Sequence, residues 1–276
     1  MTPSTATAAA TESIDDTPRM IARVENGVGW MIYSNLRRRN AVRLSMWRQI
    51  PEIVARFQAD PAVKVVALRG DGHDSFVSGA DISEFEQVRS RPEDVEVYEA
   101  AAGAAGKAIK ALTKPTVAVI ETWCVGGGIA TALSCDLRLA SDNTRFQLPA
   151  ARLGLGYSFG GIKSLVDVVG PAKAKEIFFT ARRYDAAQAL AMGLVSDVVP
   201  AADFEAEARS YLAGIAANAP LTIAAAKQAI NAVMADPEDR DLDAIAAAVT
   251  ACFASDDYRE GRTAFTEKRA PKFQGR

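Results

Sequence analysis

The sequence predicts an α/β fold followed by an all-helical region, and three features of its 276 residues indicate this. Up to about residue 200, short apolar runs alternate with segments at helical spacing, as in a mixed strand and helix body. From Ala202 onward every apolar pattern has helical spacing. Within the first part, an apolar run leads to Gly126-Gly127-Gly128, which is typical of a strand that passes through a tight turn into a helix.

Composition limits the classes of protein to which the chain can belong. A hydrophobic content of 49% can fill a sizeable core, and no apolar run approaches the roughly 20 residues that span a bilayer. With 32 basic and 34 acidic residues, no overall field favours nucleic acid or an anionic membrane. The three cysteines lack metal-type spacing, so we expect no disulfide, no zinc and a cytoplasmic location.

The chain divides into three predicted regions. Residues 1–17 are rich in Thr and Ala and are expected to form a disordered tail. Residues 18–200 form the predicted core with its site, and residues 201–276 form a helical region. The last helices have apolar faces with no strands left to cover, so we expect them to pack against another subunit.

The elements follow from local patterns. Asn26-Gly27 between two apolar runs predicts a β-hairpin. Pro51 predicts a turn or kink inside an otherwise helical segment, and Gly170-Pro171 predicts a break. The predicted strands cover residues 21–25, 28–34, 64–69, 116–120 and 195–199. The predicted helices cover residues 44–58, 91–112, 162–169, 172–180, 186–192, 204–216, 221–234, 242–253 and 258–269.

Three polar features invite a functional interpretation. The run Arg37-Arg38-Arg39 is either a solvated loop or a phosphate contact. His73 is the only histidine and lies in a predicted turn, where such a residue is more often a solvent-facing polar group than a catalyst. Asp81 is expected to cap a helix that follows it.

The triple glycine predicts an anion or oxyanion site. Glycine has no Cβ, so a ligand oxygen can approach the backbone N–H groups closely. The following helix begins at this turn, and the start of a helix favours negative charge.

Several motifs together resemble the crotonase (enoyl-CoA hydratase/isomerase) superfamily, in the family's order and from about residue 21 to residue 276. The motifs are residues 76–82 (FVSGADI), 114–118 (KPTVA), 125–128 (VGGG) with Cys135-Asp136, Pro149 with 153–155 (LGL), 189–195 (ALAMGLV), and 257–269 (DYREG to AFTEKR). The resemblance implies a crotonase-type spiral of ββα units with a C-terminal helical trimerisation region. It also implies a homotrimer or a dimer of trimers.

The resemblance further implies an acyl-CoA thioester as the partner molecule, with coenzyme A as part of the substrate and no other cofactor or metal. Members of the superfamily stabilise an enolate oxygen with two backbone N–H groups, which by motif position are those of Ala80 and Gly127. Residues lining the coenzyme A would be Ala80, Asp81, Ile82 and Ser83, with Arg38, and with Phe265 and Lys268 from a neighbouring subunit. Arginine and lysine suit this end because its phosphates are anionic.

The sequence departs from the hydratase pattern at both acid and base positions. The hydratases carry one glutamate three residues after the middle glycine and one directly after the motif proline, where this chain has Ala130 and Ala150. Alanine transfers no proton, and loss of a general acid or base removes about 10²- to 10⁴-fold of rate. The acid that isomerases often place after Leu-Gly-Leu is also absent, since residues 156–158 are Gly, Tyr and Ser.

Within the superfamily, residues 148–157 are most similar to the methylmalonyl-CoA decarboxylase branch, which has Pro-Ala and a following tyrosine. Decarboxylation generates an enolate without a base, and Tyr157 could orient the departing carboxylate by a hydrogen bond. That branch has a histidine in place of Ala80 and a glutamate in place of Ala130. The competing interpretation of Tyr157 is a core tyrosine.

Two other classes of protein remain. Two alanines at the catalytic positions also predict an acyl-CoA-binding protein that has lost catalysis. Gly154, Gly156 and Gly160 resemble a dinucleotide-binding turn, but no acidic residue closes a second strand about 20 residues on. A P-loop is excluded because no Lys-Ser/Thr follows the triple glycine.

Overall fold

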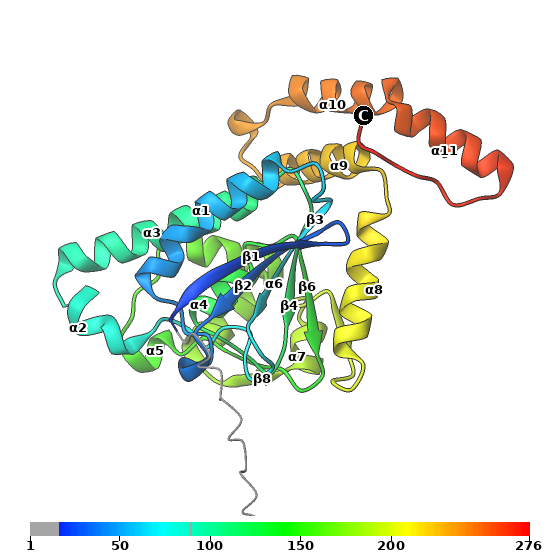
Figure 1. Ribbon diagram of the computed structural model, residues 1–276. Helices are drawn as coiled ribbons and strands as arrows, with labels where there is room; N and C mark the ends of the chain where they lie inside the picture. Colours follow the sequence, from blue (N-terminus) through cyan, green and yellow to red (C-terminus); the bar gives the residue numbers. More distant parts are fainter. Residues whose placement is uncertain (1–16, 89) are drawn as a thin grey trace, which may run out of the picture.

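The computed structural model describes residues 17–88 and 90–276, so the predicted tail, residues 1–17, lies outside the described residues except for Thr17. A six-stranded sheet forms the centre of the molecule (Figure 1), in the order β1-β2-β3-β4-β6-β9. Only β1 and β2 are antiparallel, and the other neighbours are parallel. The strands are β1 (Arg19–Glu25), β2 (Val28–Ser34), β3 (Val65–Gly70), β4 (Thr116–Ile120), β6 (Leu137–Ser141) and β9 (Asp197–Val199).

The hairpin between β1 and β2 confirms the Asn-Gly prediction. Asn26 and Gly27 both have positive φ, at 50° and 82°, and they join the paired residues Glu25 and Val28. Two positive φ values match the right-handed twist of the flanking strands, which is why Asn-Gly is favoured there.

A second, smaller sheet supplies the turns of the spiral. It contains β5 (Trp123–Val125), β7 (Arg145–Gln147) and β8 (Arg183–Asp185). Each of β4 and β6 in the large sheet is followed at once by β5 or β7 in the small sheet and then by a helix. These repeated ββα units form a crotonase-type spiral, as the sequence predicted.

Helices cover both faces of the large sheet (Figure 1). On β2, Met31 and Tyr33 belong to the cluster on the side of α1 and α3, whereas Trp30 and Ile32 belong to the cluster with α8. This alternation explains why all seven residues of β2 are buried. The helices concerned are α1 (Leu44–Ala59), α3 (Pro92–Ala111) and α8 (Phe204–Ala216).

At Pro51, where the sequence predicted a turn or kink, the structure has no turn, because the helix does not stop. Helix α1 continues from Leu44 to Ala59 with Pro51 inside it. The lost N–H bond costs stability, but buried residues on both sides of the proline, such as Ile50 and Ile53, hold the segment against the core. At Gly170, by contrast, the predicted break is confirmed by a non-helical φ of 75°.

The remaining helices lie between the strands along the chain or at the C-terminal end. Between the strands are η1 (Leu36–Arg38), η2 (Ile82–Glu84), α2 (Phe85–Val88), α4 (Gly127–Ala132), α5 (Ala150–Leu153), α6 (Phe159–Thr180) and α7 (Ala186–Ala191). At the C-terminal end are α9 (Pro220–Val233), η3 (Pro237–Asp239), α10 (Leu242–Ala254) and α11 (Asp256–Glu267), and α10 and α11 extend away from the sheet (Figure 1). No described helix combines the length and apolarity that a membrane crossing requires.

The dinucleotide-binding alternative is wrong. A dinucleotide-binding turn needs a strand that leads directly into the glycines and then a helix. Here Gly154 follows the short helix α5, and the preceding strand β7 has already ended at Gln147.

Candidate active site

The triple glycine turns the chain from β5 into α4 and lets this turn approach its neighbour. Gly126 has φ 51° and ψ −110°, a conformation that other residues rarely adopt, and its N–H donates to Gln147 O at 2.9 Å. A Cβ on Gly128 would collide with the carbonyl oxygen of Val77. The turn can therefore hold its position only with glycine at 126 and 128.

The neighbouring segment, residues 76–81, is fixed from both sides by single-residue bridges. Val77 pairs with Cys124 of β5, and Val125 N donates to Val77 O at 2.9 Å. Ala80 pairs with Val42, which donates its N–H to Gly79 O at 2.8 Å and accepts from Asp81 N at 3.0 Å. Because these bonds use the groups on either side of Ala80, the N–H of Ala80 itself points away from Val42.

The structure brings Ala80 and Gly127 together. A Cβ placed on Gly127 would lie 3.9 Å from Ala80 N and 3.8 Å from Gly79 C. Within residues 17–88 and 90–276, neither amide donates a hydrogen bond. Since α4 has only six residues, its dipole is short, and the two unbonded N–H groups are the main donors that this turn offers.

The positions of the two expected glutamates hold methyl groups in different surroundings. Ala130 is exposed on α4, and Ala150 is buried at the start of α5, with 2% of its surface accessible. Neither can donate or accept a proton.

The nearest acidic residues in the chain after Ala80 are engaged elsewhere or exposed. Glu84 is buried and accepts from Leu44 N at 2.7 Å and from Arg43 Nε at 2.9 Å, so it caps the start of α1. Asp81 caps η2 by accepting from Ser83 N at 3.0 Å. Burial by itself raises the pKa of Asp81, but hydrogen bonds from Ser83 outweigh burial and hold that pKa below its usual value. Glu86 is exposed on α2.

The residues expected to meet coenzyme A fall into two groups. Arg38 lies beside the segment of Ala80, because Ser78 Oγ donates to Arg38 O at 2.9 Å. Ile82 and Ser83 are exposed next to it, whereas the side chain of Asp81 is buried.

The second group lies on α11. Phe265 is 87% exposed, and Lys268 ends the helix. Helix α11 is at the far end of the molecule from α4 and α5 (Figure 1), so a single chain does not bring these residues to Ala80 and Gly127.

Tyr157 lies between α5 and α6 and is half-buried at the rim of the core. Its ring meets that of Phe178 edge-on, with the centroids 5.1 Å apart. This ring packing is what the core interpretation of Tyr157 predicts.

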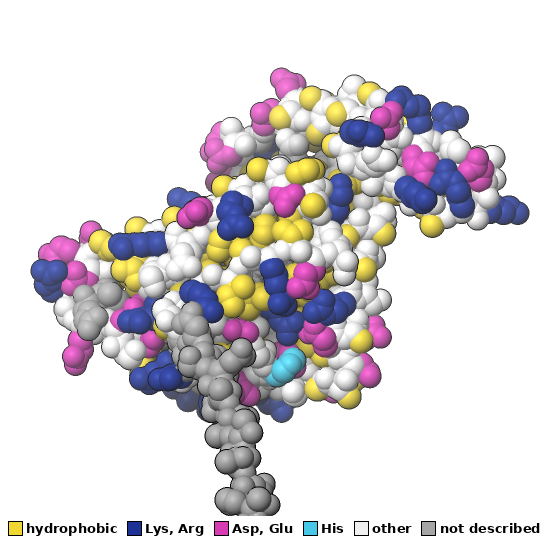
Figure 2. Space-filling model, viewed as in Figure 1, with side chains coloured by type: hydrophobic (Ala, Val, Ile, Leu, Met, Phe, Trp, Pro, Cys, Tyr) yellow, Lys and Arg dark blue, Asp and Glu magenta, His cyan; other side chains and the backbone are white. Residues whose placement is uncertain are grey.

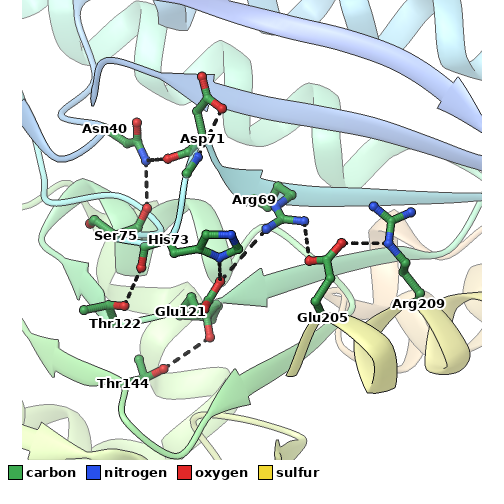
Figure 3. Close-up of polar contacts among 12 residues, drawn as sticks. Asn40, Arg69, Asp71, His73, Ser75, Glu121, Thr122, Thr144, Glu205 and Arg209 are labelled. Atoms are coloured by element: carbon green, nitrogen blue, oxygen red, sulfur yellow. Dashed lines mark hydrogen bonds and ion pairs between the residues drawn. The ribbon is translucent and has the colours of Figure 1, made fainter. Parts of the chain in front are cut away.

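The only histidine takes part in a surface network. His73 Nδ1 lies 3.2 Å from Glu121 Oε2 (Figure 3), and Glu121 is 4.0 Å from Arg69. Arg69 continues to Glu205 of α8 at 2.8 Å. The network leads from the ends of β3 and β4 to α8, which covers the face of the large sheet opposite α1 and α3.

Neither metal ligands nor reactive thiols are found at this site. Across the described ranges, no group of three or more His, Cys, Asp or Glu side chains could hold a metal ion. All three cysteines are free thiols. Burial raises the pKa of Cys124 and raises that of Cys135 to about 12, so both stay protonated.

Two aromatic residues near the paired amides were not predicted from the sequence to belong to the site. Trp47 of α1 reaches Gly127, because its Cζ2 lies 3.6 Å from the position of a Cβ there. Trp47 Nε1 donates to the hydroxyl of Tyr98 on α3 at 2.9 Å. In the sequence, Trp47 is one apolar residue of the predicted helix 44–58, and a contact across 51 residues leaves no local signal.

The spiral of ββα units with two amides converging at one glycine turn places the chain among the crotonase-type proteins. The chain belongs to the enoyl-CoA hydratase/isomerase family, which matches residues 23–276. It is accordingly an acyl-CoA-processing enzyme of that superfamily.

Named relatives agree with this family. The chain is 36% identical to a crotonyl-CoA hydratase of Syntrophomonas wolfei, across 85% of this chain and 89% of the relative. It is 34% identical to a short-chain-enoyl-CoA hydratase of Clostridium acetobutylicum, across 83% and 87%. A crystal structure of an enoyl-CoA hydratase/isomerase family protein from Hyphomonas neptunium superposes with a TM-score of 0.87 at 32% identity, across 93% of this chain and 98% of that chain.

Proposed function

We propose that this enzyme stabilises a thioester enolate with the N–H groups of Ala80 and Gly127 and works without the two hydratase glutamates. The observation that carries the proposal is the pair of adjacent amides, neither of which donates within the described chain. Two such donors lower the barrier to enolate formation, and loss of one typically costs about 2.7–4 kcal/mol. The chemistry needs no group beyond the thioester substrate.

Decarboxylation of a malonyl-type thioester is the reaction that fits the alanines. The bond between Cα and the carboxylate breaks, its electron pair forms the enolate, CO₂ leaves, and Cα then takes a proton from water. No base is needed, and apolar surroundings, to which the methyl of Ala150 would contribute, disfavour a charged carboxylate. In this reaction Tyr157 would orient the carboxylate by donating a hydrogen bond.

The names of the relatives favour hydration instead, and the fixed role of Glu84 argues against it. A hydratase needs a carboxylate at the reacting carbon. Moving Glu84 there would break its bonds to Arg43 and Leu44 N and uncap α1. An acyl-CoA-binding protein without catalysis is the second candidate, since the same alanines favour it.

One assay series separates these functions. Methylmalonyl-CoA, malonyl-CoA and crotonyl-CoA are each incubated with the protein while CO₂ release and loss of the conjugated thioester absorbance are followed. We expect release of CO₂ from a malonyl-type thioester. Hydration of crotonyl-CoA should be at least about 10²-fold slower than in a hydratase that carries both glutamates. Micromolar binding without turnover would favour the binding protein, and fast hydration would contradict the proposal.

Tyr157→Phe tests the tyrosine within the same series. A fall in CO₂ release with unchanged binding would support the orienting role. Unchanged turnover would leave Tyr157 as a core residue packed on Phe178.

We further propose that residues 18–200 carry the acyl-CoA site and that residues 201–276 join copies into a homotrimer or a dimer of trimers. A cavity of about 820 Å³ opens between α9, α10 and α11, and its lining includes Val249, Phe253 and Phe265. Figure 2 shows hydrophobic side chains at the surface in this region. A second copy seated there would bring Phe265 and Lys268 to a neighbour's Arg38, Ile82 and Ser83.

A further inference from the structure

Trp47 lies beside the paired amides, and Tyr98 is hydrogen-bonded to Trp47. The position of a Cβ on Gly127 is 3.6 Å from Trp47 Cζ2 and 3.9 Å from Ala80 N, so the indole edge, Gly127 and the Ala80 amide meet at one place. Both aromatic residues are buried, with 5% and 2% of their surfaces exposed.

The hydroxyl of Tyr98 connects the two sides of this place. It accepts from Trp47 Nε1 at 2.9 Å and donates to Val42 O at 3.1 Å. Val42 is the residue whose bridge fixes Ala80. One path therefore runs from the hydroxyl through Trp47 to Gly127, and another runs through Val42 to Ala80.

The segment that carries the Ala80 amide is held by single bridges and not by a regular strand ladder. Its bridge to Val42 is isolated and lies outside any strand, so it has no ladder of neighbouring bonds. Oxyanion donors act only when they lie about 2.7–3.1 Å from the oxygen that they stabilise, and small displacements lose much of the effect. A bond that restrains Val42 O therefore bears directly on where the Ala80 N–H points.

We propose that Trp47 and Tyr98 are positioning residues that set the separation and direction of the Ala80 and Gly127 amides. This inference rests on the proposed enolate-stabilising function and deepens it, since it names what holds the two donors in register. The competing explanation is plain packing, because Trp47 also meets the ring of Tyr33 in the core. Packing alone would alter stability without altering the preference for an enolate over a neutral thioester.

The test uses two probes that separate these explanations. Acetoacetyl-CoA has an acidic Cα–H, and its enolate is measured by near-ultraviolet absorbance, so the apparent pKa of the bound ligand reports on the oxyanion donors. Butyryl-CoA cannot enolise appreciably and reports on neutral binding. The variants are Tyr98→Phe, Trp47→Phe and both together, with Tyr211→Phe as the matched control, since Tyr211 packs against the cluster on the opposite face of the sheet.

We expect Tyr98→Phe to lower the enolate fraction of bound acetoacetyl-CoA by about three- to tenfold, less than loss of a whole donor. The dissociation constant for butyryl-CoA should change less than about twofold, and Tyr211→Phe should leave both values unchanged. Because both paths pass through the Tyr98 hydroxyl, the effects of Tyr98→Phe and Trp47→Phe should not add. If Trp47→Phe does not fold, Tyr98→Phe alone decides, since it keeps the ring.

An unchanged enolate fraction in Tyr98→Phe would overturn the inference, as would an equal loss of affinity for both probes. Failure of the proposed function looks different, because the unmodified protein itself would then bind acetoacetyl-CoA without forming the enolate, or would not bind it.

Discussion

At the scale of single residues, the turn at residues 126–128 depends on the absence of a side chain at Gly128. Gly128 faces the carbonyl oxygen of Val77, which is itself held by Val125 N at 2.9 Å and cannot retreat. At Gly160, near the start of α6, an added Cβ would meet open space, with no contact inside 4 Å. The two glycines therefore offer a matched pair.

We predict that Gly128→Ala lowers the free energy of unfolding by about 1–3 kcal/mol, because the added methyl forces the backbone apart. It should also abolish enolate formation from acetoacetyl-CoA. Gly160→Ala should leave both unchanged or stabilise the helix slightly. Urea denaturation measures the first effect, and equal stability of the two variants would show that the contact with Val77 relaxes at no cost.

Sequence motifs predicted that Ala80 and Gly127 belong to one site, and the structure places them side by side. The Trp47–Tyr98 contact could not be predicted, because neither residue stands in a recognisable motif and the pairing depends on how α1 packs against α3. The role of Glu84 as a cap for α1 was also invisible, since 40 residues separate it from Leu44.

At the scale of elements, ion pairs attach α8 to the sheet. Glu205 accepts from Arg69 Nη1 at 2.8 Å and from Arg209 Nε at 2.7 Å (Figure 3). Burial raises the pKa of Glu205, but the two arginines outweigh burial and lower it below its usual value. Stability from this group is therefore present above the unfolded pKa and is lost as the pH falls through the folded pKa.

We predict that Glu205→Gln lowers the free energy of unfolding at pH 7 by about 0.5–1 kcal/mol, since the carboxylate is partly exposed. The difference from the unmodified protein should shrink as the pH falls below about 4. Glu207→Gln, an exposed change on the same helix, is the control. A difference that is constant from pH 7 to pH 3 would mean that the charge of Glu205 is not what matters.

A second polar contact fastens α9 to the core. Lys227 is buried and donates to Asp136 Oδ2 at 2.7 Å and to Lys114 O at 3.0 Å. Asp136 also accepts from Thr116 N at 2.7 Å, so the lysine balances the charge of a carboxylate at the start of β4.

Lys227→Met should therefore lower the free energy of unfolding by about 1–3 kcal/mol, since it leaves Asp136 without its cation. Lys175→Met, at an exposed position on α6, should change it by less than about 0.5 kcal/mol. Thermal unfolding of both variants measures the difference. Equal unfolding midpoints would contradict a role for Lys227 in holding the C-terminal helices against the core.

Most long elements were predicted from the sequence, but the five-residue strand β6 was not, and among the three-residue strands only β9 falls within a predicted strand, residues 195–199. The hairpin and the helices of the C-terminal half were predicted because Asn-Gly and 3.6-residue spacing are strong local signals. Strands β5, β7 and β8 have three residues each, too few to show alternation, and they form because they pair with one another. These short strands build the turn that carries Gly126, so local residue patterns did not predict the spiral. The spiral was predicted only from the resemblance to the crotonase superfamily.

At the scale of the whole molecule, the C-terminal helices expose several large apolar side chains, as interaction surfaces do. Phe253 is 63% exposed, Phe265 is 87% exposed and Val233 is 72% exposed. We predict that Phe253→Asp shifts the protein from trimer or hexamer toward monomer in light scattering coupled to size exclusion. Val24→Asp, on the edge strand β1, should not.

An unchanged mass for Phe253→Asp would contradict the proposed interface. A monomeric mass for the unmodified protein at micromolar concentration would contradict the oligomer itself. In that case Phe265 and Lys268 could not complete a neighbour's acyl-CoA site.

The central claim is that two backbone amides stabilise a thioester enolate in a site without catalytic glutamates. The most direct measurement is the near-ultraviolet titration of acetoacetyl-CoA bound to the unmodified protein across pH. The account predicts that binding lowers the apparent pKa of the ligand, so that the enolate predominates at a pH where the free thioester is neutral. A bound ligand with an unshifted or raised pKa would contradict it.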